Sequence, residues 1–352
     1  MKKSTLTILL IPVIFIYLAV SAAAQDSKQN SMQRQRISIN EGWSFFKYES
    51  ISQADKLIYD VRPEITDNSE YIVADAKPTE ALEAKQIQEV LKPWILPSGN
   101  KFISDPQKRH IRPEGNPGSD FPFVQGNFDD SGWEKVNLPH DWAIKGPFQS
   151  GAHPEVGGGM GRLPVNGVAW YRKKLDIPAT DAGKSVFLDI DGAMSYSIVW
   201  LNGNLVGGWP YGYNSYRLDL TPYLVPGGEN QLAIRLDNPN HSARWYPGAG
   251  IYRNVWLEIT SPVHVAQWGT YITAKEVSKS SATVELEVSI DNNSKKEEAA
   301  ELLTEIFELE SKGKKTGKPV AKFRLLKTTV AAGESAAMKS SVQIKNPKLW
   351  GP

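Results

Sequence analysis

The residues most suited to chemistry are aromatic, polar and charged side chains in segments rich in Gly and Pro. One segment is Leu138-Pro139-His140-Asp141-Trp142, and another runs from Ser242 to Arg253 and includes Arg244, Trp245 and Tyr246. Aromatic rings stack on the apolar faces of sugars, and adjacent Arg, Asn or Asp side chains bind hydroxyls. We therefore take Arg244, Trp245 and Tyr246 as candidate substrate-binding residues. The alternative is that these aromatic side chains only plug the ends of a β-sandwich.

Motifs for other chemistries are missing from the sequence. The five His residues show no metal-ligand spacing and the chain has no Cys, so no metal site is predicted. No Gly-x-Ser-x-Gly motif occurs, and the run Gly157-Gly158-Gly159-Met160-Gly161 lacks the Lys and Ser or Thr of a phosphate-binding loop. We predict no catalytic residue, no metal and no cofactor in this chain.

The composition indicates an all-β protein. The 352 residues include 28 Gly, 23 Pro and 11 Trp, and such residues between short apolar runs are typical of sheets with many turns. The length is sufficient for two domains. The formal net charge of +1 argues against nucleic acid as a partner, because phosphate binding needs a basic surface. A nearly neutral chain suits a neutral ligand such as a sugar.

The first 24 residues are typical of a secretory signal peptide. Lys2-Lys3 forms a positive start, residues 6–20 are mostly apolar, and Ala22-Ala23-Ala24 offers small residues for cleavage. We therefore expect a periplasmic or secreted protein after cleavage near Ala24. The alternative is a single membrane anchor, for which the apolar run is short.

Short alternating runs over about 36–262 predict a first β-sandwich. In a strand over 185–191, Val186, Leu188 and Ile190 face the same side. Asn202-Gly203 follows a strand over 195–201 and is a strong hairpin signal. Further strands are predicted over 36–40, 169–177, 231–237 and 251–259.

A long segment of different character, about 50–125, interrupts the first domain. Apolar residues recur at helical spacing over 78–90, which predicts one helix there. The remainder is loop-like, and loops of this length in a domain are functional or disordered. Trp94, Phe102 and Phe121 argue against full disorder.

A domain boundary is predicted near Ser261-Pro262, beyond which Trp becomes sparse and Lys, Glu and Ser increase. The domain over 263–346 is predicted to be an immunoglobulin-like sandwich without a disulfide. Its strands are predicted over 283–290, with Val284, Leu286, Val288 and Ile290 on one face, and over 302–309, 320–326 and 337–344. Residues 347–352 contain two prolines and are predicted to be a linker to a domain that this chain does not supply.

Seven motifs in order between about 36 and 260 resemble glycoside hydrolase family 2, which contains β-galactosidases, β-glucuronidases and β-mannosidases. They are Asn40–Phe45, Asp129–Trp133, Leu138–Trp142, Ala169–Arg172, Trp200–Gly203, Gly227–Leu232 and Gly250–Val255. Residues 347–352 resemble the family's entry into its catalytic domain. The Leu-Pro-His-Asp-Trp form and the secretory start favour a β-galactosidase-like member.

The resemblance implies a jelly-roll sugar-binding domain, an immunoglobulin-like domain and then a catalytic (β/α)8 barrel. In this retaining family the barrel supplies two Glu residues, about 5–5.5 Å apart. The family's acid/base Glu follows an Asn, but the Asn40-Glu41 pair lies in the first strand motif and is not interpreted as catalytic. The chain alone is therefore expected to be inactive. Its expected partners are the missing barrel, in cis or in trans, and a β-linked oligosaccharide substrate.

The resemblance also implies two substrate contacts. Asn166 matches a position on a loop that reaches the barrel mouth, and Arg244 falls at a position that is acidic in some galactosidases. Arg244 keeps a charged or differently linked sugar open as an alternative to galactose, as in a β-glucuronidase- or β-mannosidase-type member. The segment over 50–125 is interpreted as a wall of the substrate groove.

Two further expectations concern how the chain behaves on its own. A free-standing carbohydrate-binding module is the alternative to an enzyme part, since the aromatic clusters occur without an active site. A surface that a barrel would cover is expected to expose apolar side chains, so a homo-oligomer is a possible state of the chain.

Overall fold

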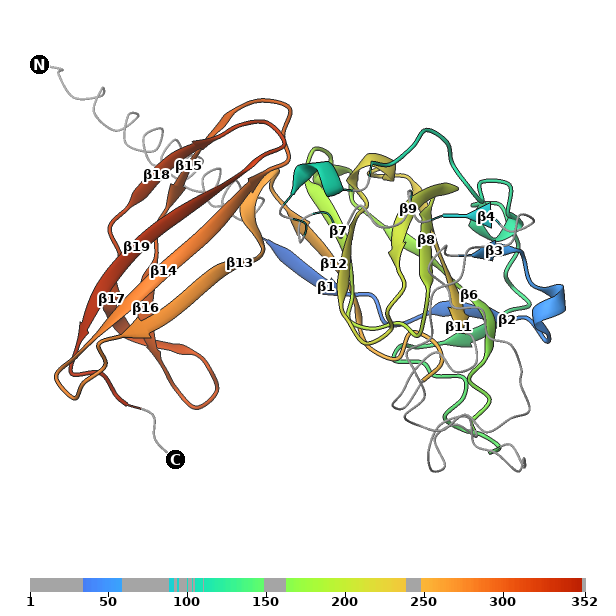
Figure 1. Ribbon diagram of the computed structural model, residues 1–352, viewed down its shortest axis with the longest axis horizontal. Coiled ribbons are helices and arrows are strands. Elements are labelled where there is room, and N and C mark those ends of the chain that lie inside the picture. The colour runs from blue at the N-terminus through green and yellow to red at the C-terminus, as the bar shows by residue number, and fades with distance from the viewer. Residues whose placement is uncertain are drawn as a thin grey trace, which may run out of the picture. The chain divides into compact units, whose positions relative to one another are not determined.

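The computed structural model describes residues 34–58, 89–91, 94, 100, 103, 105–109, 111–148, 163–238 and 248–349. They fall into two units, the first comprising 35–182 and 186–259 and the second comprising residue 34, residues 183–185 and the chain from 260 onward. Strands dominate both units (Figure 1). No helix in the described ranges is long and apolar enough to cross a membrane. The predicted signal peptide over 1–24 lies outside the described residues.

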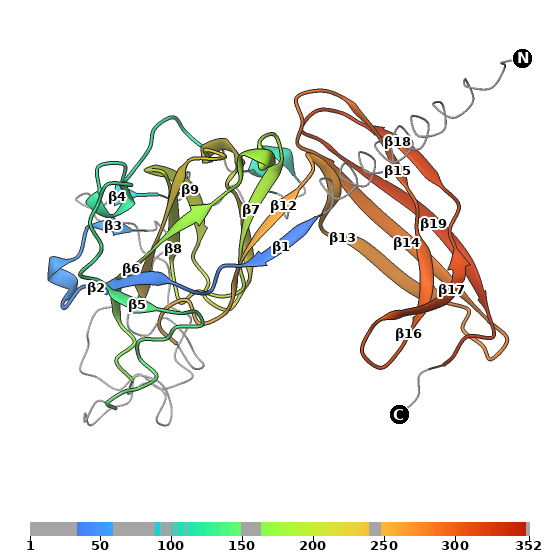
Figure 2. The ribbon, with the colours of Figure 1, turned by 180° about the vertical axis from the view of Figure 1, so that it is seen from behind.

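Two sheets form the first unit, a six-stranded antiparallel sheet in the order β5-β2-β6-β11-β8-β9 and a four-stranded sheet in the order β1-β12-β7-β10. Figure 2 shows β1 beside β12, its antiparallel neighbour. The strands are β1 Gln35–Ser38, β2 Trp43–Lys47, β5 Glu134–Val136, β6 Gly167–Asp176, β7 Ser185–Ile190, β8 Ser197–Leu201, β9 Asn204–Trp209, β10 Tyr216–Asp219, β11 Glu229–Asn238 and β12 Val255–Thr260. Short 3-10 helices accompany them: η1 Ile51–Gln53, η3 Pro106–Lys108, η4 Pro122–Val124, η6 Ala179–Asp181 and η7 Thr221–Tyr223.

Alternating residues of both sheets fill the space between them. Val186, Leu188 and Ile190 of β7 lie in this core, as their predicted alternation requires, with Tyr171 and Ile234 of the other sheet. Tyr171 and Ile234 are direct cross-strand partners, so their side chains point to the same face. The predicted all-β, two-sandwich fold class is confirmed.

The predicted hairpin at Asn202-Gly203 joins β8 to β9. Both residues have positive φ angles, 52° for Asn202 and 76° for Gly203, as a tight turn between twisted strands requires. The Asn202 side chain also accepts a hydrogen bond from the Gln231 N–H at 2.8 Å. The turn is thereby fixed to the start of β11.

The outer face of the six-stranded sheet is also buried. Trp170, Ile198, Trp200 and Ala233 point outward and pack against Leu57, Leu91 and Val124. The covering residues belong to the long segment over 50–125. Its described parts therefore form a third layer on the sandwich.

Two buried guanidinium groups attach this layer to the sheet. Arg172 Nε donates to Phe123 O at 2.8 Å and its Nη2 to Gln125 O at 2.7 Å, while Nη1 lies 2.6 Å from an Asp130 carboxylate oxygen. Arg235 forms a second ion pair, with Asp55, at 2.7 Å. Both Arg side chains are only 1% exposed, so these partners replace the water that burial removes.

The helix predicted over 78–90 lies outside the described residues except for its last two. Glu89–Val90 form the short strand β4, which pairs in parallel with β3, Leu57–Ile58. The prediction is therefore wrong for these two residues. Helical spacing in an apolar run does not exclude pairing with a distant strand, which depends on tertiary context.

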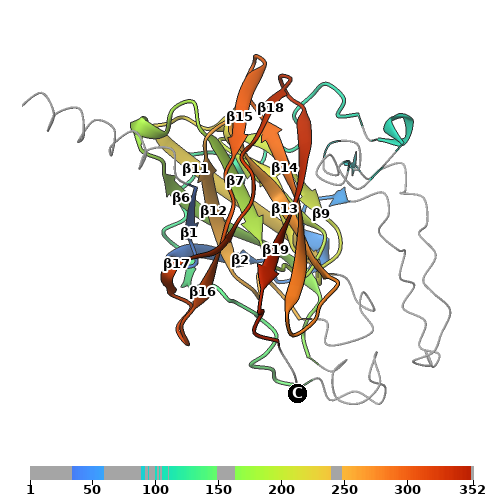
Figure 3. The same cartoon turned by 90° about the vertical axis from the view of Figure 1, so that its left-hand side faces the viewer.

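The second unit is a smaller sandwich. β13 Val263–Lys275, β14 Ser281–Asn292 and β19 Ser335–Lys345 form one sheet in that order, seen side by side in Figure 3. Two antiparallel pairs accompany them: β15 Glu298–Leu302 with β18 Leu326–Val330, and β16 Glu305–Leu309 with β17 Lys315–Lys322. Leu286, Val288 and Ile290 of β14 are buried in the core, with Val284 packed against it.

Two strands predicted in the second unit are each divided. The strand predicted over 302–309 becomes β15 and β16, and the strand predicted over 320–326 becomes β17 and β18. Phe323 N donates to Thr304 O at 3.0 Å, so the two breaks meet. Phe323 is 6% exposed and Leu303 is 67% exposed. The two segments remain partners on both sides of the break, since Leu302 lies opposite Leu326 and Glu305 lies opposite Lys322. At the break the Phe323 side chain turns into the core.

Candidate functional site

Asn166 lies at one end of the first sandwich, directly before β6. Its side chain is half-buried and makes no hydrogen bond with the residues that the structure describes. The next residue, Gly167, has a φ of +140°, and an added Cβ there would lie 2.7 Å from the Lys47 side chain. A side chain at 167 would therefore disturb the approach of Asn166 to the sheet.

Asn238 fixes the chain beside Asn166. It ends β11 and is fully buried, and its Nδ2 donates to Val165 O at 2.9 Å and to Gly248 O at 2.8 Å. Ser195 Oγ lies 3.3 Å from Asn238 Oδ1. One amide side chain thus ties the entry of β6 to both ends of the segment over 239–247.

Arg244, Trp245 and Tyr246 lie in that segment and outside the described residues. Asn238, which flanks this segment on one side, bonds both Val165, the neighbour of Asn166, and Gly248, which flanks the segment on the other side. The flanks of the segment and Asn166 therefore share one end of the sandwich. Sequence reasoning missed Asn238, because an Asn after a predicted strand carries no local signal of burial.

The Leu138–Trp142 motif has a structural role in this fold. His140 Nδ1 lies 2.8 Å from Tyr171 Oη, and His140 N donates to Ile251 O at 2.8 Å. Burial lowers the pKa of His140, against the opposing charges of Glu134 and Asp141, so the ring is neutral at pH 7. The neutral, half-buried imidazole thus holds Tyr171 in place, and the His140 backbone N–H holds the chain at Ile251.

Trp142 supports the alternative that some aromatic side chains plug the sandwich. Its ring stacks on Phe45 with centroids 6.0 Å apart, and it packs against a small buried cluster that contains Val165 and Ala249. Trp142 N also donates to Ala249 O at 2.9 Å. Trp142 thus supports the loop that presents Asn166.

Three tyrosines lie at the same end of the sandwich, and only Tyr252 belonged to a segment singled out from the sequence. Tyr211 is 54% exposed and makes an edge contact with Tyr213, with ring centroids 5.4 Å apart. Tyr252 Oη donates to Gly212 O at 3.0 Å, and Tyr196 N donates to Pro210 O. Two tyrosines flanking one Gly between strands are a signal that could have identified this exposed aromatic surface.

Two buried acidic side chains of the first sandwich, Asp189 and Glu258, do not form an open catalytic pair. Asp189 and Glu258 both bind Arg217, at 2.6 and 2.9 Å, and are 9% and 5% exposed. Burial by itself lowers the pKa of Arg217, but its bonds to Asp189 and Glu258 raise that pKa above its usual value. The three groups are therefore a fixed ion network and not an acid and a nucleophile.

No group of three or more His, Asp or Glu residues in the described parts of the chain is placed to hold a metal ion. The side chains available at the sandwich end are an amide, a half-buried indole, one exposed phenol and two half-buried phenols. Such groups bind and orient a polar, ring-shaped ligand by stacking and hydrogen bonds. They supply no group for cleaving one.

Two family models match the chain. The galactose-binding-domain-like model of glycosyl hydrolase 2 matches residues 165–248, and the model of glycosyl hydrolases family 2 matches residues 263–352. The first match begins beside Asn166 and ends at Gly248. It therefore covers both the candidate Asn and the segment that carries Arg244.

Relatives with known names cover most of the chain. A β-galactosidase of Bacteroides ovatus is 40% identical over 66% of this chain and 26% of its own length. A β-glucuronidase of Formosa agariphila is 28% identical over 64% of this chain and 24% of its own length. The chain thus spans about a quarter of the length of these curated relatives.

Solved structures share the fold. A glycosyl hydrolase family 2 member from Bacteroides cellulosilyticus aligns with a TM-score of 0.58 at 24% identity, over 90% of this chain and 32% of that one. A Bacteroides uniformis β-glucuronidase aligns with a TM-score of 0.59 at 21% identity, over 90% of this chain and 29% of that one. With its two matching domains, this chain belongs to glycoside hydrolase family 2.

Proposed function

We propose that the chain is the N-terminal, non-catalytic part of an exported retaining glycoside hydrolase that acts on β-linked galactosides. Its first sandwich lines one side of the substrate groove, and both sandwiches support a catalytic barrel. The observation that carries the proposal is the Asn238 clamp, which holds the entry of β6, next to Asn166, beside both ends of the segment with Arg244.

Retaining hydrolysis requires an acid and a nucleophile, two carboxyl groups about 5–5.5 Å apart in an open site. The carboxylates of Asp189 and Glu258 are buried on Arg217 and do not meet this need. The proposal therefore assigns both catalytic carboxylates to a barrel outside this chain. Asn166, Arg244, Trp245 and Tyr246 are assigned to substrate binding only.

The choice of a galactoside follows the β-galactosidase of Bacteroides ovatus, the relative with 40% identity. A β-glucuronide is the alternative, since Arg244 supplies a cation that suits a carboxylate. It is favoured by the β-glucuronidase relative of Formosa agariphila. Nitrophenyl β-galactoside and nitrophenyl β-glucuronide are therefore the two substrates to compare.

The first experiment assays the purified chain alone with both substrates. We expect no turnover above a heat-inactivated sample, because binding groups without a catalytic pair do not cleave the bond. Turnover by the chain alone would disprove the assignment of catalysis to a barrel.

The second experiment replaces the matching segment of the Bacteroides ovatus relative with this chain. We expect Asn166→Ala to lower kcat/KM of the hybrid about 10-fold or more, as expected for loss of a polar contact to substrate. Asn127→Ala is the control, since Asn127 is exposed and lies away from the clamp. Equal effects of the two variants would contradict the substrate role of Asn166.

A free-standing carbohydrate-binding module is the second candidate, favoured by the exposed ring of Tyr211. Calorimetric titration with galactosides and plant oligosaccharides separates the two. Tight binding by the chain alone favours the module, and no heat at millimolar sugar removes it.

Export is part of the proposal and has its own test. Expression in a bacterium with a periplasm, followed by mass spectrometry of the intact chain, should give a mature protein that starts at Gln25. Retention of residues 1–24 in a membrane fraction would favour the anchor instead.

A further inference from the structure

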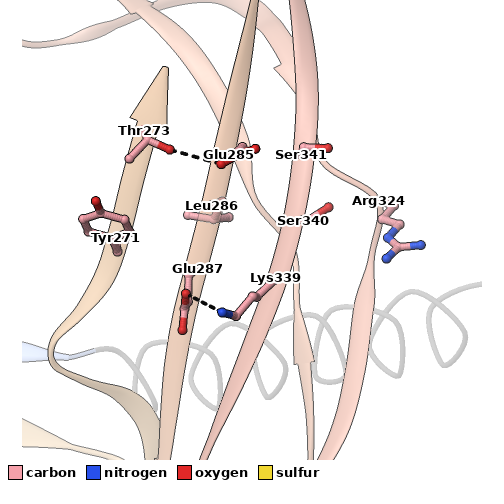
Figure 4. A pocket seen from close by; sticks show the side chains of 9 residues that line it. All are labelled: Tyr271, Thr273, Glu285, Leu286, Glu287, Arg324, Lys339, Ser340 and Ser341. Carbon is pink, nitrogen blue, oxygen red and sulfur yellow. Dashed lines mark hydrogen bonds and ion pairs between the residues drawn. The ribbon is translucent and has the colours of Figure 1, made fainter. Parts of the chain in front are cut away.

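The outward face of the three-stranded sheet in the second unit carries a shallow hollow with a volume of about 680 Å³ (Figure 4). Two rows of cross-strand partners form its floor. Tyr271, Glu287 and Lys339 face one another across β13, β14 and β19, and Thr273, Glu285 and Ser341 form the next row. Because side chains alternate along a strand, these six residues share one face of the sheet.

The two carboxylates in the hollow are already neutralised. Glu287 lies 2.9 Å from Lys339 Nζ, and Glu285 lies 2.7 Å from Lys275 Nζ. Glu285 also accepts a hydrogen bond from the Thr273 hydroxyl at 3.4 Å. The carboxylate oxygens can still accept hydrogen bonds from the hydroxyl groups of a ligand. The Lys partners cancel the negative charge that the two Glu side chains would otherwise place on this face of the sheet.

Arg324 supplies the remaining charge. It is exposed, lines the hollow beyond β19, and makes no ion pair or hydrogen bond with the described part of the chain. In Figure 4 it lies on the opposite side of the β14–β19 pair from Tyr271. With the two Glu–Lys pairs neutral, one uncompensated guanidinium gives the hollow a net positive charge.

Tyr271 provides an apolar platform at the other edge. Its side chain is 67% exposed, although burial of an aromatic ring against another group is energetically favourable. Neighbouring strands lie about 4.8 Å apart, so the floor from β13 to β19 is about 10 Å wide. That width is greater than one pyranose ring and suits an oligosaccharide.

We propose that this hollow is a saccharide-binding site for an oligosaccharide that carries a uronate group. Tyr271 stacks on a pyranose ring, and Arg324 binds the uronate carboxylate through two parallel N–H donors. Ser341 and the Glu287–Lys339 pair form hydrogen bonds with the ligand hydroxyls that lie between the stacked ring and the bound carboxylate. Binding here is independent of the activity proposed above, since the hollow lies wholly within the second unit.

Titration calorimetry of the full chain with tetragalacturonate and with its methyl ester tests this assignment. The two probes share the same pyranose rings, and the ester lacks the negative charges, so we expect the acid to bind about 10-fold more tightly than the ester. Arg324→Gln should remove this preference. Tyr271→Ala should weaken binding of both probes, and Tyr271→Phe should preserve it because the ring remains.

Lys312→Gln is the matched control, since it removes one exposed cation from the β16–β17 turn outside the hollow. Thermal unfolding followed by circular dichroism checks that each variant is folded, as expected for exposed positions. Absence of binding, equal affinity for acid and ester, or binding that survives the double variant Tyr271→Ala, Arg324→Gln would each overturn the proposal. Loss of the preference for the acid in Lys312→Gln would overturn it too, because the preference would then come from the general positive charge of the surface and not from the hollow.

Discussion

The two sandwiches differ in where they place charge. In the first, Arg172 and Arg235 are each 1% exposed and bind carboxylates of distant segments. In the second, pairs such as Lys322–Glu305 join neighbouring strands with side chains 63% and 27% exposed. A buried guanidinium without its partners is costly, whereas an exposed pair is screened by water. Charge therefore selects which segments pack together in the first sandwich and contributes little in the second.

The two sandwiches also differ in how much of their main sheet is buried. The six-stranded sheet buries apolar side chains on both faces, including Tyr171 on one face and Trp170 on the other. The sheet of the second sandwich buries one face and leaves Tyr271 exposed on the other. The first sandwich can thus hold loops rigidly at its end, and the second has a free face on which a ligand can bind.

The largest loss of stability is expected when the buried charge of the first sandwich is removed at Arg172. Arg172→Met leaves Phe123 O, Gln125 O and the Asp130 carboxylate without their buried donor. We expect the free energy of unfolding of the first sandwich to fall by about 3–5 kcal/mol. Urea denaturation followed by Trp fluorescence measures it.

Lys174→Met is the control for Arg172→Met, since it removes a cation from the same strand. Lys174 is 67% exposed and lies 3.8 Å from Glu229, so we expect a loss below about 1 kcal/mol. Similar losses for both variants would show that burial does not set the contribution of charge.

The second effect concerns the separate core of the second sandwich. Ile290 is 6% exposed in that core, and Ile290→Ala should lower its free energy of unfolding by about 2–4 kcal/mol. Scanning calorimetry should show one transition move down while that of the first sandwich stays. Ser289→Ala, on the other face of β14, should move neither. A joint shift in Ile290→Ala would mean that the sandwiches unfold as one body.

The third effect is a pH dependence shared by both sandwiches. Burial lowers the pKa of His140 in the first and of His264 in the second. In the unfolded chain these rings take up a proton near pH 6.5, while the folded chain resists protonation until lower pH. Stability from this source is therefore present above about pH 6.5 and falls as the pH drops below it.

His140→Gln should flatten this decline for the first sandwich alone, and His264→Gln for the second alone. Melting temperatures measured between pH 7.5 and 5 provide the comparison. A steeper decline in either variant would mean that the other titrating groups of that sandwich govern its acid sensitivity.

The smallest effect is expected for an exposed pair of the second sandwich. Lys322→Ala removes the partner of Glu305, 2.7 Å away, and should change the free energy of unfolding by less than about 1 kcal/mol. The difference from the unmodified chain should shrink further in 0.5 M salt. A larger loss of stability that does not depend on salt would mean that this exposed pair contributes as much as the buried ion pair of Arg172.

Local patterns predicted much of the fold. Val186, Leu188 and Ile190 alternate in sequence and all lie in the core, and Asn202-Gly203 makes the turn between β8 and β9. Such features depend on residues within one strand or one turn. The family motifs added the order of the domains and pointed to Asn166.

The division of predicted strands shows the limit of this approach. Leu303 continues an apolar pattern but is exposed, and Phe323 ends one but is buried. Where the strands break depends on which side chain enters the core of the whole sandwich, as Phe323 does. Periodicity within a segment carries no information about the position of such a break.

The sequence by itself determined that this chain folds as two β-sandwiches, whereas the side chains that meet a sugar remain a prediction. Only the tertiary structure decided that a third layer covers the six-stranded sheet, through Arg172 and Phe123, which are 49 residues apart. It also decided that Asn238 reaches Val165, 73 residues away, to hold the ends of the candidate loop together. The physical reason is that buried polar groups must find partners once water is removed, and only the folded chain determines which partners are near.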